Sequence, residues 1–194
     1  ATPSSDARRK TPLSKTDCPT TDKEKEEMLT VPYKYRQVIG SLRHLEQWTR
    51  PDLSTALFNI LSSFQSNPGK AHWSELKRLL HYVRETRNLA IHYGEHANPN
   101  AEKMGHDVSS QLTCFVDADW ATDKETRRSR TGYVFFSNNG PVAWRSRLQV
   151  TQALSTCEAE YMAASDAACM NAYLRYMLHD IQEIVDCGNL EQMG

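Results

Sequence analysis

Apolar residues recur every three or four positions between residues 33 and 85, which is the spacing of one face of an α-helix. Two breaks divide this stretch: Pro51 suits a helix first turn with Thr49 as its cap, and residues 67–69 (NPG) end a helix. The stretch therefore predicts three amphipathic helices packed as a small antiparallel bundle. Their apolar stripes are Tyr35, Val38, Leu42, Leu45 and Trp48; Leu53, Leu57, Ile60, Leu61 and Phe64; and Trp73, Leu76, Leu80 and Val83.

The C-terminal half changes to the alternation that is typical of β-strands. Residues 112–117 carry apolar side chains on both faces, which predicts a buried strand, and residues 131–137 and 141–150 predict two more. The NNG run at residues 138–140 is a strong hairpin signal between the last two. The sequence therefore predicts an antiparallel three-stranded meander, and a further short strand at residues 89–93.

A long helix is predicted to begin at Ser155, because Ser155 and Glu158 are spaced as a capping box. In such a box the Ser155 hydroxyl accepts the Glu158 backbone amide, and the Glu158 carboxylate accepts the Ser155 amide. Glu158 thus has a structural role, which leaves Glu160 free to face elsewhere. Alanines keep one side of this helix narrow, so that it can lie close to the sheet, and its apolar side extends towards Val185.

These patterns predict an α+β protein with a helical segment followed by a meander and a long helix. Residues 1–30 are polar and rich in charge and proline, which predicts a flexible lead-in. The helical segment is expected at residues 31–94, a linker at residues 95–108, the strands and helix at residues 109–185, and a tail at residues 186–194.

The composition excludes several classes of protein. The formal net charge is −1, so no global basic field attracts nucleic acid, and such binding would depend on local patches. The five cysteines are scattered and odd in number, which fits neither a disulfide framework nor a zinc site. No apolar run reaches the roughly 18 residues of a membrane span. The chain begins at Ala1, so we expect either a fragment or a mature form whose targeting segment has been removed.

The candidate chemistry lies at the end of the first predicted strand. Asp117 and Asp119 are two residues apart, a spacing that puts both carboxylates on the same side of a strand. Two like charges side by side are tolerated where water, a cationic partner or a metal balances them. The alternative is a strand that ends in a solvated, Asp-rich turn.

Several ordered motifs over residues 12–181 resemble the Pol polyprotein of copia-type LTR retrotransposons. The motifs FVDADWA, TGYVFF, PVAW and ALSTCEAEYMA resemble the start of its RNase H region, and they occupy residues 115–121, 131–136, 141–144 and 153–163. Upstream, the motifs VPY, VIGSL, TRPD and HWSELKR resemble the end of its reverse transcriptase, at residues 31–33, 38–42, 49–52 and 72–78. The resemblance implies a thumb- or connection-like helical segment and a truncated RNase H-like unit.

The resemblance also implies a metal site. Nucleases of this family cleave the RNA of an RNA–DNA hybrid with two Mg²⁺ ions about 4 Å apart, which hard carboxylate oxygens hold. The motif match makes Asp117 the first ligand and Glu160 the second, both catalytic by ancestry, while Asp119 is a neighbour. The family's third and fourth aspartates come from later elements. Because the chain is expected to stop before them, we expect a vestigial site without productive Mg²⁺ binding, and little or no nuclease activity.

Basic residues offer weaker candidates for contact with nucleic acid. Arg127, Arg128 and Arg130 lie between the first two strands and could contact phosphates, or they could form a solvated basic loop. The third predicted helix has a basic outer surface made of Lys70, Lys77, Arg78, Arg84 and Arg87. This surface could likewise touch a phosphate backbone or simply face water.

Three functional hypotheses remain open at this point. The first is a non-catalytic, intracellular Pol remnant. The second is a secreted protein, because some RxLR-type effectors of downy mildews resemble copia Pol pieces; it would bind a host protein in the cytoplasm or nucleus and suppress defence-related cell death. The third is a protein that binds RNA–DNA hybrid without cleavage. In each case the meander is expected to keep an open sheet edge that can self-associate.

Overall fold

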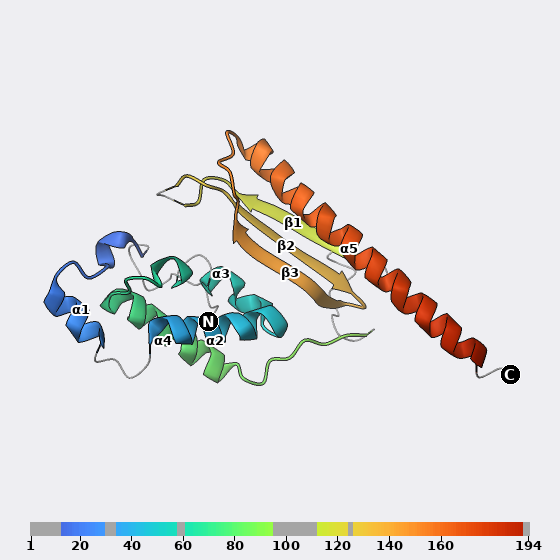
Figure 1. Ribbon diagram of the computed structural model, residues 1–194, viewed down its shortest axis with the longest axis horizontal. Helices are drawn as coiled ribbons and strands as arrows, with labels where there is room; N and C mark the ends of the chain where they lie inside the picture. Colours follow the sequence, from blue (N-terminus) through green and yellow to red (C-terminus); the bar gives the residue numbers. More distant parts are fainter. Residues whose placement is uncertain (1–12, 30–33, 58–60, 95–111, 124–125, 192–194) are drawn as a thin grey trace. The chain divides into compact units, whose positions relative to one another are not determined.

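The computed structural model describes residues 13–29, 34–57, 61–94, 112–123 and 126–191 of the chain. The chain divides into two compact units, Ala1–His92 and Tyr93–Gly194. In the described residues, the first unit is helical and the second combines a sheet with a long helix (Figure 1). The protein is α+β, as the sequence predicts. The linker predicted at residues 95–108 lies outside the described residues.

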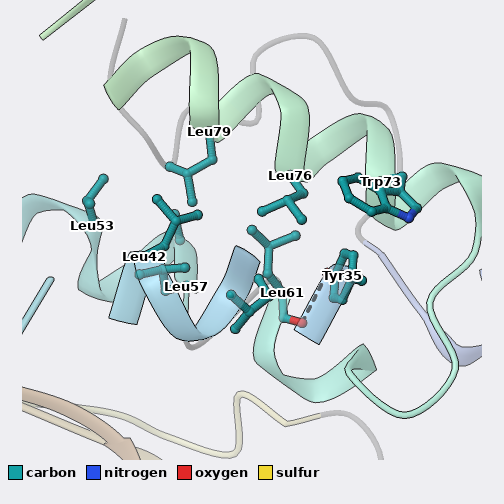
Figure 2. Close-up of a cluster of buried hydrophobic side chains, with 10 residues drawn as sticks. Tyr35, Leu42, Leu53, Leu57, Leu61, Trp73, Leu76 and Leu79 are labelled. Atoms are coloured by element: carbon teal, nitrogen blue, oxygen red, sulfur yellow. Dashed lines mark hydrogen bonds between the residues drawn. The ribbon is translucent and has the colours of Figure 1, made fainter. Parts of the chain in front are cut away.

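Two helices, α2 (Tyr35–Trp48) and α4 (Lys70–Glu85), supply much of the core of the first unit. Figure 2 shows their apolar side chains meeting those of the segment between them, and the Tyr35 hydroxyl donating a hydrogen bond of 3.1 Å to the Leu61 carbonyl. The core residues that are at most 1% exposed are Ile39, Leu53, Leu57, Leu61, Leu76 and Leu79. Most of the predicted stripe residues of α2 and α4 therefore belong to the core. Trp48 and Leu80 do not, since they are 65% and 37% exposed, and Ile39 and Leu79 occupy buried positions beside them.

The segment between α2 and α4 is an irregular helical stretch rather than the regular α-helix that the sequence predicts. Its described residues include the 3₁₀-helices η2 (Pro51–Leu53) and η4 (Ser62–Phe64) and the short α-helix α3 (Ser54–Ala56), and residues 58–60 lie outside the described residues. Serine side chains compete for helix carbonyls within this stretch. The Ser62 hydroxyl, for example, donates to the Leu57 carbonyl at 2.6 Å.

A buried arginine fixes the turn after α2. Arg50 is 5% exposed, and its guanidinium donates to both Asp52 carboxylate oxygens at 2.9 and 2.8 Å and to the Thr86 carbonyl at 3.1 Å. Burial raises the pKa of the Asp52 carboxyl, but hydrogen bonds from Arg50 and Tyr82 outweigh it and hold that pKa below its usual value. Thr49 ends α2 instead of capping the next helix, whereas Pro51 lies in a first turn as predicted.

Residues 13–29, expected to belong to a flexible lead-in, are folded against the helical unit. They form η1 (Lys15–Asp17) and α1 (Asp22–Leu29), and the side chains of Leu13 and Met28 pack on the core. Their backbone comes so close to α4 that a Cβ at Gly69 would lie 2.0 Å from the Asp17 carbonyl oxygen. The sequence analysis missed this contact because Leu13 and Met28 belong to no helical or strand periodicity of apolar residues.

The second unit contains the predicted meander. Strands β1 (Thr113–Asp119), β2 (Arg130–Ser137) and β3 (Gly140–Leu148) pair antiparallel in the order β1-β2-β3. Asn138 and Asn139 have φ angles of 49° and 62°, as a type I′ hairpin turn requires, so the turn prediction is confirmed. The short strand predicted at residues 89–93 is wrong, since no strand forms there.

Strand β1 is not the buried strand that its apolar pattern predicts. Phe115 and Val116 are each 40% exposed. The reason is topological: in the described part of the chain β1 pairs with β2 alone and is an edge of the sheet. An apolar pattern on both faces predicts burial only when both edges and both faces are covered.

Helix α5 (Thr156–Glu191) lies along the sheet and extends beyond it (Figure 1). Ala159, Ala163 and Ala167 are buried at its sheet-facing side, as the alanine pattern predicts. The helix continues to Glu191, so residues 186–191 belong to it rather than to a tail. None of the described helices is long and apolar enough to span a membrane.

Candidate functional site

The two faces of the sheet have different surroundings. Tyr133 and Phe135 of β2 pack against Ala167 and Leu174 of α5, so these side chains define the face that the helix covers. Side chains alternate along a strand, and paired residues share a face. Phe136 therefore lies on the other face, which α5 does not cover.

Asp117 and Asp119 both lie on that uncovered face. Asp117 pairs with Gly132 and Asp119 with Arg130, positions that alternate with Tyr133 and Thr131. The predicted common side for the two carboxylates is therefore confirmed by the strand register. Both side chains are exposed, and the residue opposite Asp117 is a glycine, which leaves room above it.

The first turn of α5 is capped much as the sequence predicts. The Ser155 hydroxyl accepts the Glu158 amide at 3.1 Å. The Glu158 carboxylate accepts the Leu154 amide at 2.6 Å, one residue before the predicted donor. Glu158 is thus engaged at the helix start, and Glu160 is exposed beyond it.

Helix geometry sets the direction in which Glu160 leaves α5. Asp166 binds Arg147 of β3 at 2.7 Å, so the flank of α5 that carries Asp166 is turned towards β3. Glu160 is six residues earlier, which places it about 120° away around the helix axis, across the buried alanine stripe. Since β1 is the opposite edge of the sheet, Glu160 projects from the β1 side of the helix.

Three polar contacts hold the start of α5 against the end of the sheet. The buried Gln149 amide donates to the Ala159 carbonyl at 2.9 Å and to the Thr131 hydroxyl at 3.2 Å. The Trp120 indole, directly after β1, donates to the Ala153 carbonyl at 3.3 Å. These bonds fix the position of Glu160 relative to β1.

The sequence did not reveal the roles of Gln149 and Trp120. Trp120 belongs to the FVDADWA motif, so its position was marked, but a motif does not show which carbonyl an indole reaches. Gln149 directly follows the third strand, and nothing in the sequence distinguishes it from an exposed polar residue. Its burial to 4% exposure comes from tertiary packing, which no local pattern predicts.

The predicted metal ligands do not form a carboxylate cluster within the described residues. Groups of three or more His, Cys, Asp or Glu with ligand atoms within 4.8 Å of one another include neither Asp117 nor Glu160; such a group occurs at His179, Asp180 and Glu183, exposed on α5. Asp117 lies on the face of the sheet that α5 does not cover, whereas Glu160 lies on α5 itself, on the β1 side of the helix.

The three arginines differ in their availability to a ligand. Arg127 is exposed, with a left-handed φ of 55°, and Arg128 is half-buried, with its Nε donating to a backbone carbonyl 3.3 Å away. Arg130 is 8% exposed. Burial lowers the pKa of its guanidinium, which Asp119 and Asp123 partly offset. Only Arg127 and Arg128 therefore lie where a phosphate could reach them.

Comparisons with known proteins give a consistent picture of ancestry. The chain is 41% identical over 140 residues to "Secreted RxLR effector protein 161" of Plasmopara viticola, a match that covers 72% of this chain and 89% of that protein. It is 39% identical over 169 residues to "Retrovirus-related Pol polyprotein from transposon TNT 1-94" of Nicotiana tabacum, covering 87% of this chain and 12% of the polyprotein. It is 37% identical over 140 residues to the corresponding polyprotein of transposon RE1 of Arabidopsis thaliana, again covering 72% of this chain but only 9% of the polyprotein. No family model and no solved structure matches the chain.

The contact between Gln149 and α5 leads to a test of how Glu160 is positioned. Replacing the buried Gln149 by leucine removes two hydrogen bonds and leaves the Ala159 carbonyl without this donor, which should lower the free energy of unfolding by about 1–3 kcal/mol. Urea unfolding measures this change, and amide hydrogen exchange of residues 156–160 should become faster. The matched control is Gln152→Leu at an exposed position, with an expected change within about 0.5 kcal/mol. Equal effects of the two substitutions would contradict the role given to Gln149.

Proposed function

The chain belongs to the copia-type, retrovirus-related Pol family of transposon-derived sequences, and from this premise we propose that it is a non-catalytic remnant of an RNase H-like nuclease unit. The 169 matched residues span 12% of the TNT 1-94 polyprotein, so the activities of that whole protein are not transferred to this chain. The proposal concerns residues 1–194 alone: they do not cleave RNA–DNA hybrid.

The architecture of the second unit supports the RNase H-like part of the proposal. A three-stranded meander carries Asp117 on its first strand, and a long helix then carries Glu160 near its start. This is the order in which the motif resemblance assigns the first two metal ligands. Gln149 and Trp120 keep the helix start beside the end of β1, while the Asp117 side chain lies on the face of the sheet that α5 does not cover.

The single observation that carries the non-catalytic part is that, among the described residues, Asp117 and Glu160 join no cluster of potential metal ligands. Two-metal hydrolysis needs a pair of divalent ions about 4 Å apart, one to activate water and one to stabilise the leaving oxygen. Each Mg²⁺ prefers octahedral oxygen coordination, so several carboxylates must converge. In the part of the chain that is described, neither Asp117 nor Glu160 belongs to a group of three or more acidic, His or Cys ligand atoms within 4.8 Å of one another.

A cleavage assay with a labelled RNA–DNA hybrid tests this proposal. Purified protein with Mg²⁺ or Mn²⁺ should give no more product than its Asp117→Asn variant, because the carboxylate has no complete site in which to act. The matched control is Asp186→Asn, which removes an exposed carboxylate on the far half of α5. Metal-dependent cleavage that Asp117→Asn abolishes and Asp186→Asn preserves would refute the proposal.

A second candidate function is favoured by one specific observation. The chain covers 89% of the length of the relative named as a secreted RxLR effector, at 41% identity. We propose as the alternative that this protein acts inside a host plant cell, binds a host protein there and suppresses defence-related cell death. A unit without a complete metal site is compatible with such a role, since binding surfaces do not need the catalytic carboxylates.

Expression in plant leaf cells tests the alternative. Residues 1–194 produced in the cytoplasm should reduce electrolyte leakage after a cell-death elicitor, relative to an unrelated protein of equal abundance. The Asp117→Asn variant should be equally effective, because the proposed action does not use that carboxylate. Unchanged leakage with the wild-type protein at verified abundance would exclude this function in those cells.

A further inference from the structure

A buried histidine holds the turn at which α4 begins. The backbone N–H of Gly69, the residue before α4, donates to Nδ1 of His72 at 2.9 Å. His72 is 0% exposed, and its ring stacks on Phe64 with the two ring centroids 4.1 Å apart. A ring nitrogen that accepts a hydrogen bond carries no proton, so this imidazole is neutral, with its single proton on Nε2.

A second proton on His72 would destabilise this turn in two ways. Nδ1 would become a donor, so two N–H groups would point at each other and the hydrogen bond from Gly69 would be lost. The resulting cation would be fully buried at the third residue of α4, where the helix dipole is positive. The closed turn therefore requires the neutral imidazole.

The carboxylates on the elements around this turn are engaged elsewhere. The charged and titratable groups of these elements are Lys15, Asp17, Cys18, residues 22–27 of α1, Tyr35, Lys70 and Glu75, while η4 carries no charge. The carboxylates of Asp17 and Glu24 accept backbone amides of their own segment. Those of Asp22, Glu27 and Glu75 pair with lysine or arginine side chains. Glu26 is exposed to water. Each of the paired carboxylates therefore has a donor other than His72.

Residues 13–29 are attached to the same turn. The Asn67 side-chain amide donates to the Pro19 carbonyl at 3.1 Å, and Lys70 pairs with Glu27. At Gly69 the backbone of η1 comes so close that there is no space for a Cβ. Leu13 and Met28 pack on the core from this segment, and both are only partly buried. A segment with so few apolar contacts opens more readily than the centre of a core.

We propose that His72 is a proton-controlled switch: uptake of a proton by its imidazole opens the turn at residues 67–70 and releases residues 13–29 from the helical unit. In the open turn the imidazole takes up its proton near pH 6.5, as a free histidine does. The closed turn excludes that proton, so it is fully favoured above this pH and becomes less favoured as the pH falls. Release uncovers the part of the core that Leu13 and Met28 cover.

Amide hydrogen exchange of residues 1–194 tests the switch. Protection factors, which correct for the intrinsic pH dependence of exchange, should fall about tenfold for residues 13–29 between pH 7.5 and pH 5.5, while those of α2 and β2 stay unchanged. In His72→Asn the fall should disappear, because an amide oxygen can accept the Gly69 N–H but does not titrate. The matched control is His81→Asn, at an exposed position of the same helix, which should keep the tenfold fall.

Three results of this experiment would overturn the proposal. The first is protection of residues 13–29 that does not change with pH in the wild-type protein. The second is a tenfold fall that persists in His72→Asn. The third is an equal fall in α2, because the helical unit would then unfold as a whole instead of releasing one segment.

A substitution that opens the turn without changing His72 provides an independent test. Gly69→Ala places a Cβ 2.0 Å from the Asp17 carbonyl oxygen, so the protection of residues 13–29 should be lost already at pH 7.5 and should no longer depend on pH. The matched control is Gly40→Ala in α2, where a Cβ meets nothing within 4 Å and both properties should be retained. Full protection of residues 13–29 in Gly69→Ala would refute their attachment to this turn, and with it the switch.

Discussion

The core of the second unit depends on the packing of α5 against one face of a three-stranded meander. The helix lies close to the sheet because its facing side chains are small, namely Ala159, Ala163 and Ala167. The rings of Tyr133 and Phe135 of β2 fill the space between the sheet and the helix. Close packing of this kind maximises dispersion contacts and apolar burial. Within the described residues of this unit, α5 covers one face of the sheet, and no strand pairs with the outer side of β1.

The packing of α5 on one face of the sheet is consistent with the ancestry of the site and with its proposed present state. The helix start still lies beside the end of β1, where Gln149 and Trp120 hold it, so Asp117 and Glu160 keep the elements that the copia-type resemblance assigns to them. Neither carboxylate belongs to a group of three or more potential metal ligands among the described residues.

The sequence correctly predicted those features that depend on residues close together in the chain. The helical stripes of α2 and α4, the turn at Asn138 and Asn139, and the cap at Ser155 follow from spacing, positive φ and hydroxyl hydrogen bonding. Tertiary context decided the rest. The exposure of β1 depends on which strands neighbour it, and the folding of residues 13–29 depends on a close backbone approach at Gly69. Neither can be predicted from the residues themselves, and the assignment of Asp117 and Glu160 as ligands came from resemblance rather than from pattern.

The central claim, that two carboxylates remain from a larger set, is tested most directly by following their side-chain NMR signals during a Mg²⁺ titration of residues 1–194. The account predicts that Asp117 and Glu160 respond independently, with dissociation constants that are millimolar or weaker, because isolated carboxylates compete poorly with the hydration shell of the ion. A joint response of both carboxylates in the micromolar range, with further acidic residues shifting alongside them, would contradict it.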